Sequence, residues 1–391
     1  MSEPTAFEVL NTPSWMNKEF FTEVLKKSEK DDEILVNNIF VTPSNNRSND
    51  SLHFELIVYY SAKKLKDLSK SLIVKTAPES DEEKPESTST SLTFVSKPNI
   101  SICSKILPTL EEELRKIDEY NIFASRVLFQ SLEPKECIVF ENNVPKGYEV
   151  MRARHCNMEE VKAAFLKLAK WHAVSYKIAN EDNTANMSAH FKSIEEMPSI
   201  IPKIQKFIDK LETLDASKKM ILKMCITSLK PMHRTEKSPS KGIFVLCHGR
   251  FHRENIVFKH NSNGQLEDVK LINLQDCFYG PAMFDVIYAK YTIMDSNIRT
   301  NYIDELIHYY SLNFIETLKK LDFQGEIPKV SDFYDDILRI QYPELFHMKD
   351  VIIPIWHAFA VGDSESGDVD AIEEAIDKEM ETLVPTLYGI Q

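Results

Sequence analysis

The sequence predicts an α+β protein of two lobes, with a small β-rich lobe first and a larger, mostly helical lobe after it. Branched and aromatic residues crowd the early chain in short runs typical of strands, at residues 33–41, 52–61, 71–77 and 136–142. Apolar residues at helical spacing dominate later, most clearly over residues 158–178. We therefore expect an N-lobe over residues 1–143 and a C-lobe over residues 144–391.

The N-lobe is expected to open with a helix and to contain polar connections. Tryptophan, phenylalanine, valine and leucine recur at helical spacing over residues 15–28, which predicts an amphipathic helix. The polar run KKLKDLSK, at residues 63–70, is expected to connect the second and third strands. PESDEEKPESTST, at residues 78–90, is acidic and proline-containing, and it predicts an insertion on the surface. Residues 104–120 predict a helix that is broken at Pro108.

A short β-hairpin is expected to interrupt the helical C-lobe. The runs GIFVLCHG, at residues 242–249, and DVKLINLQD, at residues 268–276, both resemble strands. The segment NSNGQ between them is rich in turn-forming residues. We therefore place a hairpin within residues 242–276.

The charge balance argues against a general nucleic-acid-binding protein. The chain has 60 acidic and 47 basic residues, whereas nucleic-acid binding needs a basic face. No stretch approaches the roughly 18 apolar residues of a membrane helix, and no basic segment precedes an apolar run at the start. We therefore expect neither a membrane span nor a signal peptide. The six cysteines form no C-x-x-C pair, which favours a reduced, cytoplasmic protein, although counting alone leaves three disulfides open.

The stretch CHGRFHREN, at residues 247–255, carries the strongest functional signal. A His-Gly-Asp followed after four residues by Asn is typical of the catalytic loop of small-molecule kinases. The acid orients the substrate hydroxyl and accepts its proton, and the asparagine helps to hold the metal. His248 and Asn255 are in place, but Arg250 occupies the position of the acid. The nearby Glu254 is out of register, because it directly precedes Asn255.

This loop and the later stretch DVKLINLQDCFYGPAMFDVIYAKYT resemble the insect ecdysteroid kinase-like family, which is close to choline and aminoglycoside kinases. LIVKT resembles the family's phosphate-binding strand, FENNVPKGYEV its hinge, and LAKWHAVSYKI the helix motif that follows the hinge. The resemblance implies a protein-kinase-like fold, ATP and Mg²⁺ as cofactors, and a steroid-like or similar hydroxylated small molecule as substrate. It implies a phosphate-binding role for Lys75, nucleotide-binding roles for the hinge residues and a metal-binding role for Asn255; the hinge residues are Glu141, Asn142 and Asn143.

The sequence departs from the family at both acidic positions of the site. Arg250 replaces the catalytic acid, and Asn273, in INLQ, replaces the metal-binding acid. Two negative charges are thus exchanged for one positive charge, and unit charges about 4 Å apart interact by roughly 4 kcal/mol at an effective dielectric of 20. A magnesium ion would therefore meet repulsion where it needs ligands. Asp276 could supply a ligand only if a bulge or turn re-aims it.

These departures favour a catalytically impaired family member, a pseudokinase that binds a small molecule or nucleotide. The segment SKPNISICS, at residues 96–104, also lacks the glutamate that would pair with Lys75 in the family. Two alternatives stay open, an active ATP-dependent O-kinase and a scaffold that binds neither nucleotide nor small ligand. Arg250 is either a drifted, solvent-facing residue or an anion clamp that grips a phosphate or carboxylate. His172 is interpreted as a scaffold residue, and His248 as a residue that hydrogen-bonds the loop backbone.

Overall fold

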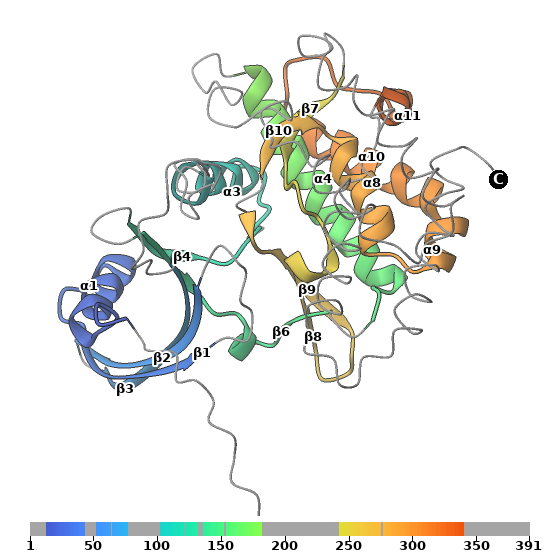
Figure 1. Ribbon diagram of the computed structural model, residues 1–391. Coiled ribbons are helices and arrows are strands. Elements are labelled where there is room, and N and C mark those ends of the chain that lie inside the picture. Colours follow the sequence, from blue (N-terminus) through green and yellow to red (C-terminus); the bar gives the residue numbers. More distant parts are fainter. Residues whose placement is uncertain are drawn as a thin grey trace, which may run out of the picture. The chain divides into compact units, whose positions relative to one another are not determined.

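The computed structural model describes residues 13–43, 52–63, 65–76, 102–120, 122–131, 136–151, 154–181, 242–274 and 277–339 (Figure 1). The chain forms two compact units. The first is drawn from Met1–Glu112, Asn121–Glu149 and Phe258–Gln275, and the second from Glu113–Tyr120, Val150–Val257 and Asp276–Gln391. The lobe boundary expected at residues 143–144 stays a prediction. The acidic insertion expected at residues 78–90 lies outside the described residues.

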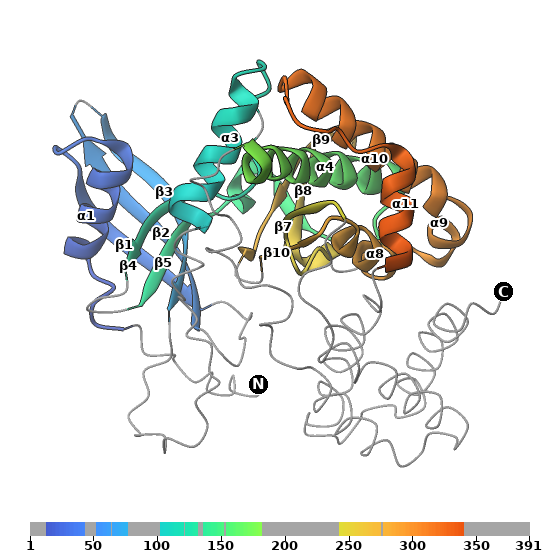
Figure 2. The same ribbon diagram turned by 90° about the horizontal axis from the view of Figure 1, so that it is seen from above.

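A five-stranded antiparallel sheet forms the frame of the first unit. Its order is β1-β2-β3-β5-β4, with β1 (Leu35–Pro43), β2 (Leu52–Ala62), β3 (Leu65–Thr76), β4 (Val127–Ser131) and β5 (Cys137–Glu141). Helix α1 (Lys18–Glu29) lies along one face of this sheet (Figure 2). The side chain of Asn17 caps α1, because its Oδ1 accepts a hydrogen bond from the Phe20 N–H at 2.9 Å. The N-terminal helix and the early strands that the sequence predicts are thus present.

Buried and more exposed side chains alternate along the strands, so that one face of the sheet is buried. Phe54, Leu56 and Val58 of β2 pack with Phe21 and Leu25 of α1 in the core of the unit. The intervening positions of β2 are more exposed, as the two-residue period of a strand requires. The same alternation along β3 buries Leu72 and Val74 and leaves Lys75 half-buried. Lys75 therefore lies on the face of the sheet opposite α1.

The polar run at residues 63–70 was wrongly predicted as a connector. β3 begins at Leu65, and its first half pairs with the end of β2 from Leu65 opposite Ala62 to Leu68 opposite Tyr60. Backbone hydrogen bonds hold this ladder, so polar side chains on its exposed end do not prevent strand formation.

The strand pairing predicted within residues 242–276 is also wrong in part. β7 (Phe244–Cys247) pairs with β10 (Phe278–Pro281), whereas the NSNGQ turn joins β8 (Ile256–His260) to β9 (Leu266–Leu271). Strand β6 (Tyr148–Val150) joins β8 and β9 in a separate three-stranded sheet of the order β6-β8-β9. The five residues of β8 were missed because they directly follow a polar loop and a single turn of 3-10 helix.

Helices make up most of the described second unit. α4 (Met158–Glu181) packs against α10 (Ile303–Lys320) and β7. The remaining helices of this unit are α8 (Met283–Thr292), α9 (Ser296–Asn301) and α11 (Val330–Arg339). Most of α3 (Leu107–Arg115), which begins beside Pro108, belongs to the first unit. The prediction of an α+β chain with a β-rich first part and helices later is confirmed. Among the described helices, none combines the length and the apolar character that crossing a bilayer requires.

Candidate functional site

The residue expected to bind phosphate and the residue at the expected metal position contact each other in the first unit. The Lys75 ammonium donates a hydrogen bond to Asn273 Oδ1, although 198 residues separate the two in sequence. Asn273 follows β9 and adopts a φ of +61°, a left-handed conformation that asparagine tolerates. The Lys75 Nζ also lies 5.8 Å from the centre of the Phe140 ring on β5. This contact brings two sequence-predicted site residues into one place.

The Lys75–Asn273 contact does not fit a magnesium site of the usual kind. Magnesium in phosphoryl-transfer sites is held by carboxylates together with substrate phosphates. Asn273 offers a neutral amide oxygen, and that oxygen already accepts a hydrogen bond from an ammonium group. A magnesium ion bound to the same oxygen would face the charge of Lys75 at close range. Lys75 itself suits the phosphates of a nucleotide, because the residue is half-buried and its ammonium group carries three donors.

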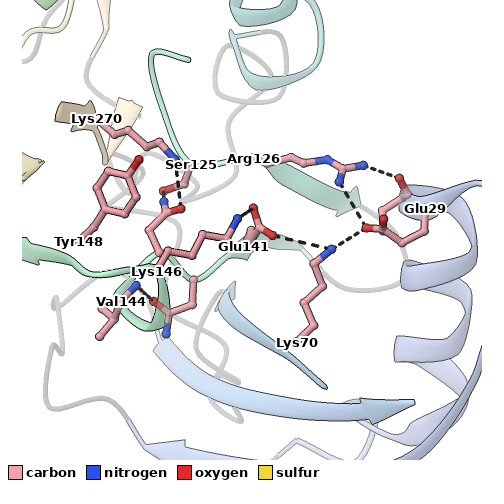
Figure 3. A network of polar contacts seen from close by, with 12 residues as sticks. Glu29, Lys70, Ser125, Arg126, Glu141, Val144, Lys146, Tyr148 and Lys270 are labelled. Atoms are coloured by element: carbon pink, nitrogen blue, oxygen red, sulfur yellow. Dashed lines mark hydrogen bonds and ion pairs between the residues drawn. The ribbon is translucent and has the colours of Figure 1, made fainter. Parts of the chain in front are cut away.

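The side chain of Glu141 lies in an ion-pair network within the first unit (Figure 3). Its carboxylate is 2.8 Å from the Lys146 ammonium and 3.8 Å from the Lys70 ammonium. Lys70 continues the network to Glu29 at the end of α1, at 2.6 Å. Arg126 also reaches Glu29, at 3.3 Å. Glu141 therefore links the end of β5 to the rest of the unit by charge.

The next two residues of the hinge segment shape its turn. The Asn142 side chain accepts a hydrogen bond from the Val144 N–H at 3.0 Å and donates one to Ser71 Oγ at 3.1 Å. The Asn143 side chain donates to Ser125 Oγ at 2.6 Å (Figure 3). Both side chains are buried. A nucleotide-binding role for Glu141, Asn142 and Asn143 stays a prediction.

A buried lysine lies beside this turn. Lys270 of β9 is 8% exposed, and its ammonium lies 4.3 Å from the centre of the Tyr148 ring, a cation–π geometry. The ammonium also donates a hydrogen bond to Asn143 Oδ1 at 3.4 Å, and the Tyr148 hydroxyl donates to Asp268 Oδ2 at 2.5 Å. Burial lowers the pKa of Lys270, and the nearby Asp268 carboxylate partly opposes this effect. Sequence patterns gave no signal for this lysine.

In the second unit, Asp285 of α8 anchors the loop that carries Arg250. Its carboxylate is fully buried and accepts hydrogen bonds from the backbone N–H groups of His248 at 2.6 Å and Gly249 at 3.0 Å. Gly249 has a φ of +81°, which glycine adopts without the penalty of a side chain. Hydrogen bonds to a carboxylate are stronger than neutral ones. Asp285 therefore fixes the backbone directly before Arg250.

Further hydrogen bonds within the loop join the predicted residues His248, Arg250 and Asn255. The backbone N–H of Arg250 donates to His248 Nδ1 at 3.3 Å, and its carbonyl accepts from the Asn255 side-chain amide at 2.9 Å. The His248 and Asn255 side chains are buried, whereas the Arg250 side chain is half-buried and Glu254 is exposed. His248 thus contacts the loop backbone, as its interpretation required. Catalytic or metal-binding roles for these three residues stay predictions.

A buried cluster of side chains surrounds Asp285, the residue that anchors the loop. Ligand-type atoms of His172, Cys247 and Asp285 lie within 4.8 Å of one another, which raises the question of a metal site. His172 Nε2 lies 3.2 Å from Asp285 Oδ2, and its Nδ1 lies 2.6 Å from the Tyr310 hydroxyl. A neutral ring that donates from Nε2 and accepts at Nδ1 satisfies both contacts.

The protonation of the cluster argues for a hydrogen-bonded scaffold. Burial lowers the pKa of His172, although Asp285 opposes the shift. Burial raises the pKa of Cys247, whose Sγ–H donates to the Pro281 carbonyl at 3.3 Å. Metals bind the thiolate, and the thiolate is disfavoured here. The geometry is in line with the interpretation of His172 as a scaffold residue.

The profile of the ecdysteroid kinase-like family matches residues 51–323, well over half of the 391-residue chain. The chain belongs to the ecdysteroid kinase-like family. No curated protein matches the sequence significantly.

Several solved structures are similar to this ecdysteroid kinase-like chain at low identity. A choline kinase from Cryptosporidium parvum Iowa II has a TM-score of 0.46 and 13% identity, over 96% of this chain and 98% of that one. The gentamicin complex of APH(2'')-IIa has a TM-score of 0.41 and 13% identity, over 94% and 96%. The ADP-bound aminoglycoside phosphotransferase APH(2'')-Ib has a TM-score of 0.36 and 12% identity, over 95% and 99%. These scores are too low to carry an argument, so the assignment rests on the family match.

In this ecdysteroid kinase-like protein the predicted site residues fall into two sets, each in its own unit. Lys75 and Asn273 belong to the first unit, whereas Arg250 and Asn255 belong to the second. Asp276 lies outside the described residues, as does most of the segment SKPNISICS.

One residue that the sequence did not indicate stands directly beside the predicted site. His53 of β2 is the cross-strand partner of Lys75 on β3. Only the register of the two strands brings these residues together, and that register is not readable from the residues alone.

Proposed function

We propose that this ecdysteroid kinase-like protein is a pseudokinase that binds a nucleotide, or a similar phosphate-bearing small molecule, without magnesium. The observation that carries the proposal is the hydrogen bond from the Lys75 ammonium to the Asn273 amide. At the position where the family's acid would bind metal, a neutral group instead holds a cation. A phosphate oxygen is a stronger acceptor for an ammonium than an amide oxygen is, so an incoming phosphate can replace Asn273 as the partner.

Arg250 supports the same proposal in the second unit. Its backbone is fixed by the contacts to His248 and Asn255, and the anchor Asp285 holds the two preceding residues. The residue is half-buried, which weakens the screening of its charge by water. A guanidinium presents paired donors that match the oxygens of a phosphate. The proposed role of Arg250 is therefore that of an anion clamp in place of a catalytic acid.

Thermal-shift titration with ATP tests the proposal. The protein should be stabilised by ATP equally in EDTA and in excess magnesium. Arg250→Ala should lose most of the shift, since a charge-assisted hydrogen bond is worth about 1.5–3 kcal/mol. Arg253→Ala is the matched control, because it removes the same charge from the same loop at a residue outside the predicted site. A shift that requires magnesium would contradict the proposal, and no shift at all would favour the scaffold alternative.

The second candidate function is an active ATP-dependent O-kinase that phosphorylates a steroid or similar hydroxylated small molecule. Family membership favours it, since the matched span includes the whole loop and both strand motifs. It requires transfer of the γ-phosphate with magnesium present. Incubation with radiolabelled ATP and a panel of hydroxylated steroids would reveal it, and labelled product above that of Lys75→Met would establish it. Cytoplasmic placement stays a prediction.

A further inference from the structure

We propose that His53 forms a second contact for the anion bound at Lys75, and that anion binding at this site takes up a proton on His53. The inference rests on the proposed function, because it concerns the same bound phosphate. It adds a residue outside the family motifs and a coupling between pH and affinity.

The strand register places both side chains on one face of the sheet. His53 and Lys75 are directly opposite each other on the antiparallel strands β2 and β3. Directly opposite residues of such a pair point to the same face, with their Cβ atoms roughly 5 Å apart. The neighbours Phe54 and Val74 point to the other face and are buried against α1. The two side chains therefore start from neighbouring positions on this face, and the charge of Lys75 acts on the His53 imidazole.

The charges around His53 keep its ring neutral before an anion binds. Burial, and then the charge of Lys75, lower the pKa of His53 to about 4. Along β2 the next residue on this face is Glu55, and across β3 the partner of Lys75 is the apolar Ile138 of β5. Asn273, which holds the Lys75 ammonium, is uncharged. Among the described residues, Lys75 is the charged group that lowers the pKa of His53, and a phosphate bound to Lys75 would offset that charge.

A bound phosphate would reverse the electrostatic effect on the His53 ring. One unit of opposite charge about 4 Å from the ring, at an effective dielectric of 20, raises the pKa by about three. The pKa of His53 would then rise from about 4 to near 7. Because the bound form holds the proton more tightly, affinity increases as the pH falls through the interval between these two values. The resulting imidazolium adds an N–H donor to the phosphate.

Isothermal titration calorimetry of ATP in two buffers of different ionisation enthalpy measures the proton uptake directly. From the two pKa values, wild-type protein should take up close to one proton more than His53→Gln near pH 6, and about 0.1 more near pH 8. The ratio of the dissociation constants of His53→Gln and wild type should be about tenfold larger near pH 6 than near pH 8. ATP itself titrates in this range, but its contribution is the same for both proteins and cancels in the comparison. His53→Asn serves as a second variant, and circular dichroism establishes that each variant is folded.

The outcomes separate this inference from the proposed function. Equal proton uptake by wild type and a folded His53 variant would overturn the role of His53 and leave nucleotide binding intact. The absence of any ATP binding to wild type would overturn both. In the protein without ligand, NMR titration of His53 should show its pKa rising in Lys75→Met, and an unchanged pKa would contradict the pairing of the two side chains.

Discussion

Replacement of Asp285 by asparagine should destabilise the protein more than any other single-atom change in the loop scaffold. The wild-type carboxylate accepts hydrogen bonds from two backbone N–H groups, at 2.6 and 3.0 Å, and contacts His172 at 3.2 Å. In Asp285→Asn one oxygen becomes a donor that faces another donor, which leaves a buried group unsatisfied at a cost of about 1–3 kcal/mol. The remaining bonds change from charge-assisted to neutral and lose roughly 1 kcal/mol each. The expected loss is therefore about 3–5 kcal/mol.

Urea denaturation followed by tryptophan fluorescence measures this loss. Trp171 is a suitable reporter, because its indole N–H donates to the Leu246 carbonyl, at 2.6 Å, on the strand that leads into the loop. Asp335→Asn is the matched control, since Asp335 lies exposed on α11 and should change stability by no more than about 0.5 kcal/mol. A loss below about 1 kcal/mol in Asp285→Asn would refute the anchoring role of this carboxylate.

Three further predictions follow from the same contacts. The double variant Arg250→Asp with Asn273→Asp should make stabilisation by ATP depend on magnesium, because both lost acids return. Equal stabilisation in EDTA and in magnesium would contradict the view that the loss of these two acids abolishes magnesium binding. Lys75→Met should weaken ATP binding at least tenfold in calorimetry. Lys66→Met alters an exposed lysine of the same strand and should leave the affinity unchanged. An equal loss of ATP affinity in both variants would contradict a specific phosphate-binding role for Lys75. Because burial lowers the pKa of His172, its share of stability is complete above the unfolded pKa of about 6.5 and is lost as the pH falls below that value. Urea midpoints at several pH values should show this slope for wild type and a shallower one for His172→Gln, and identical slopes would exclude His172 as the source.

Motif spacing allowed the site residues to be named but not placed. The order of LIVKT, CHGRFHREN and INLQ in the sequence assigned Lys75, Arg250 and Asn273 to one kind of site. The structure adds that Lys75 and Asn273 contact each other, which spacing over 198 residues could not show. The short runs of branched and aromatic residues likewise predicted the early strands. In the structure, one face of their sheet is buried against α1.

The residues that sequence patterns missed depend on register and on burial. His53 lies in an ordinary strand, and its pairing with Lys75 places it beside a predicted site residue. Lys270 lies in the polar-looking run DVKL, yet packing beside Tyr148 buries it. The polar start of β3 was mistaken for a connector, because the polarity of exposed side chains says little about whether their backbone pairs in a sheet. Cross-strand partners and buried charges are set by the tertiary fold, so local sequence carries little signal for them.

The dissociation constant of ATP, measured by calorimetry in EDTA and again in excess magnesium, tests the central claim most directly. A pseudokinase that binds phosphate without magnesium predicts two dissociation constants within about threefold of each other, a difference of less than 1 kcal/mol. Magnesium that tightens binding tenfold or more would contradict the account, because it would mean that the protein still binds the metal together with ATP.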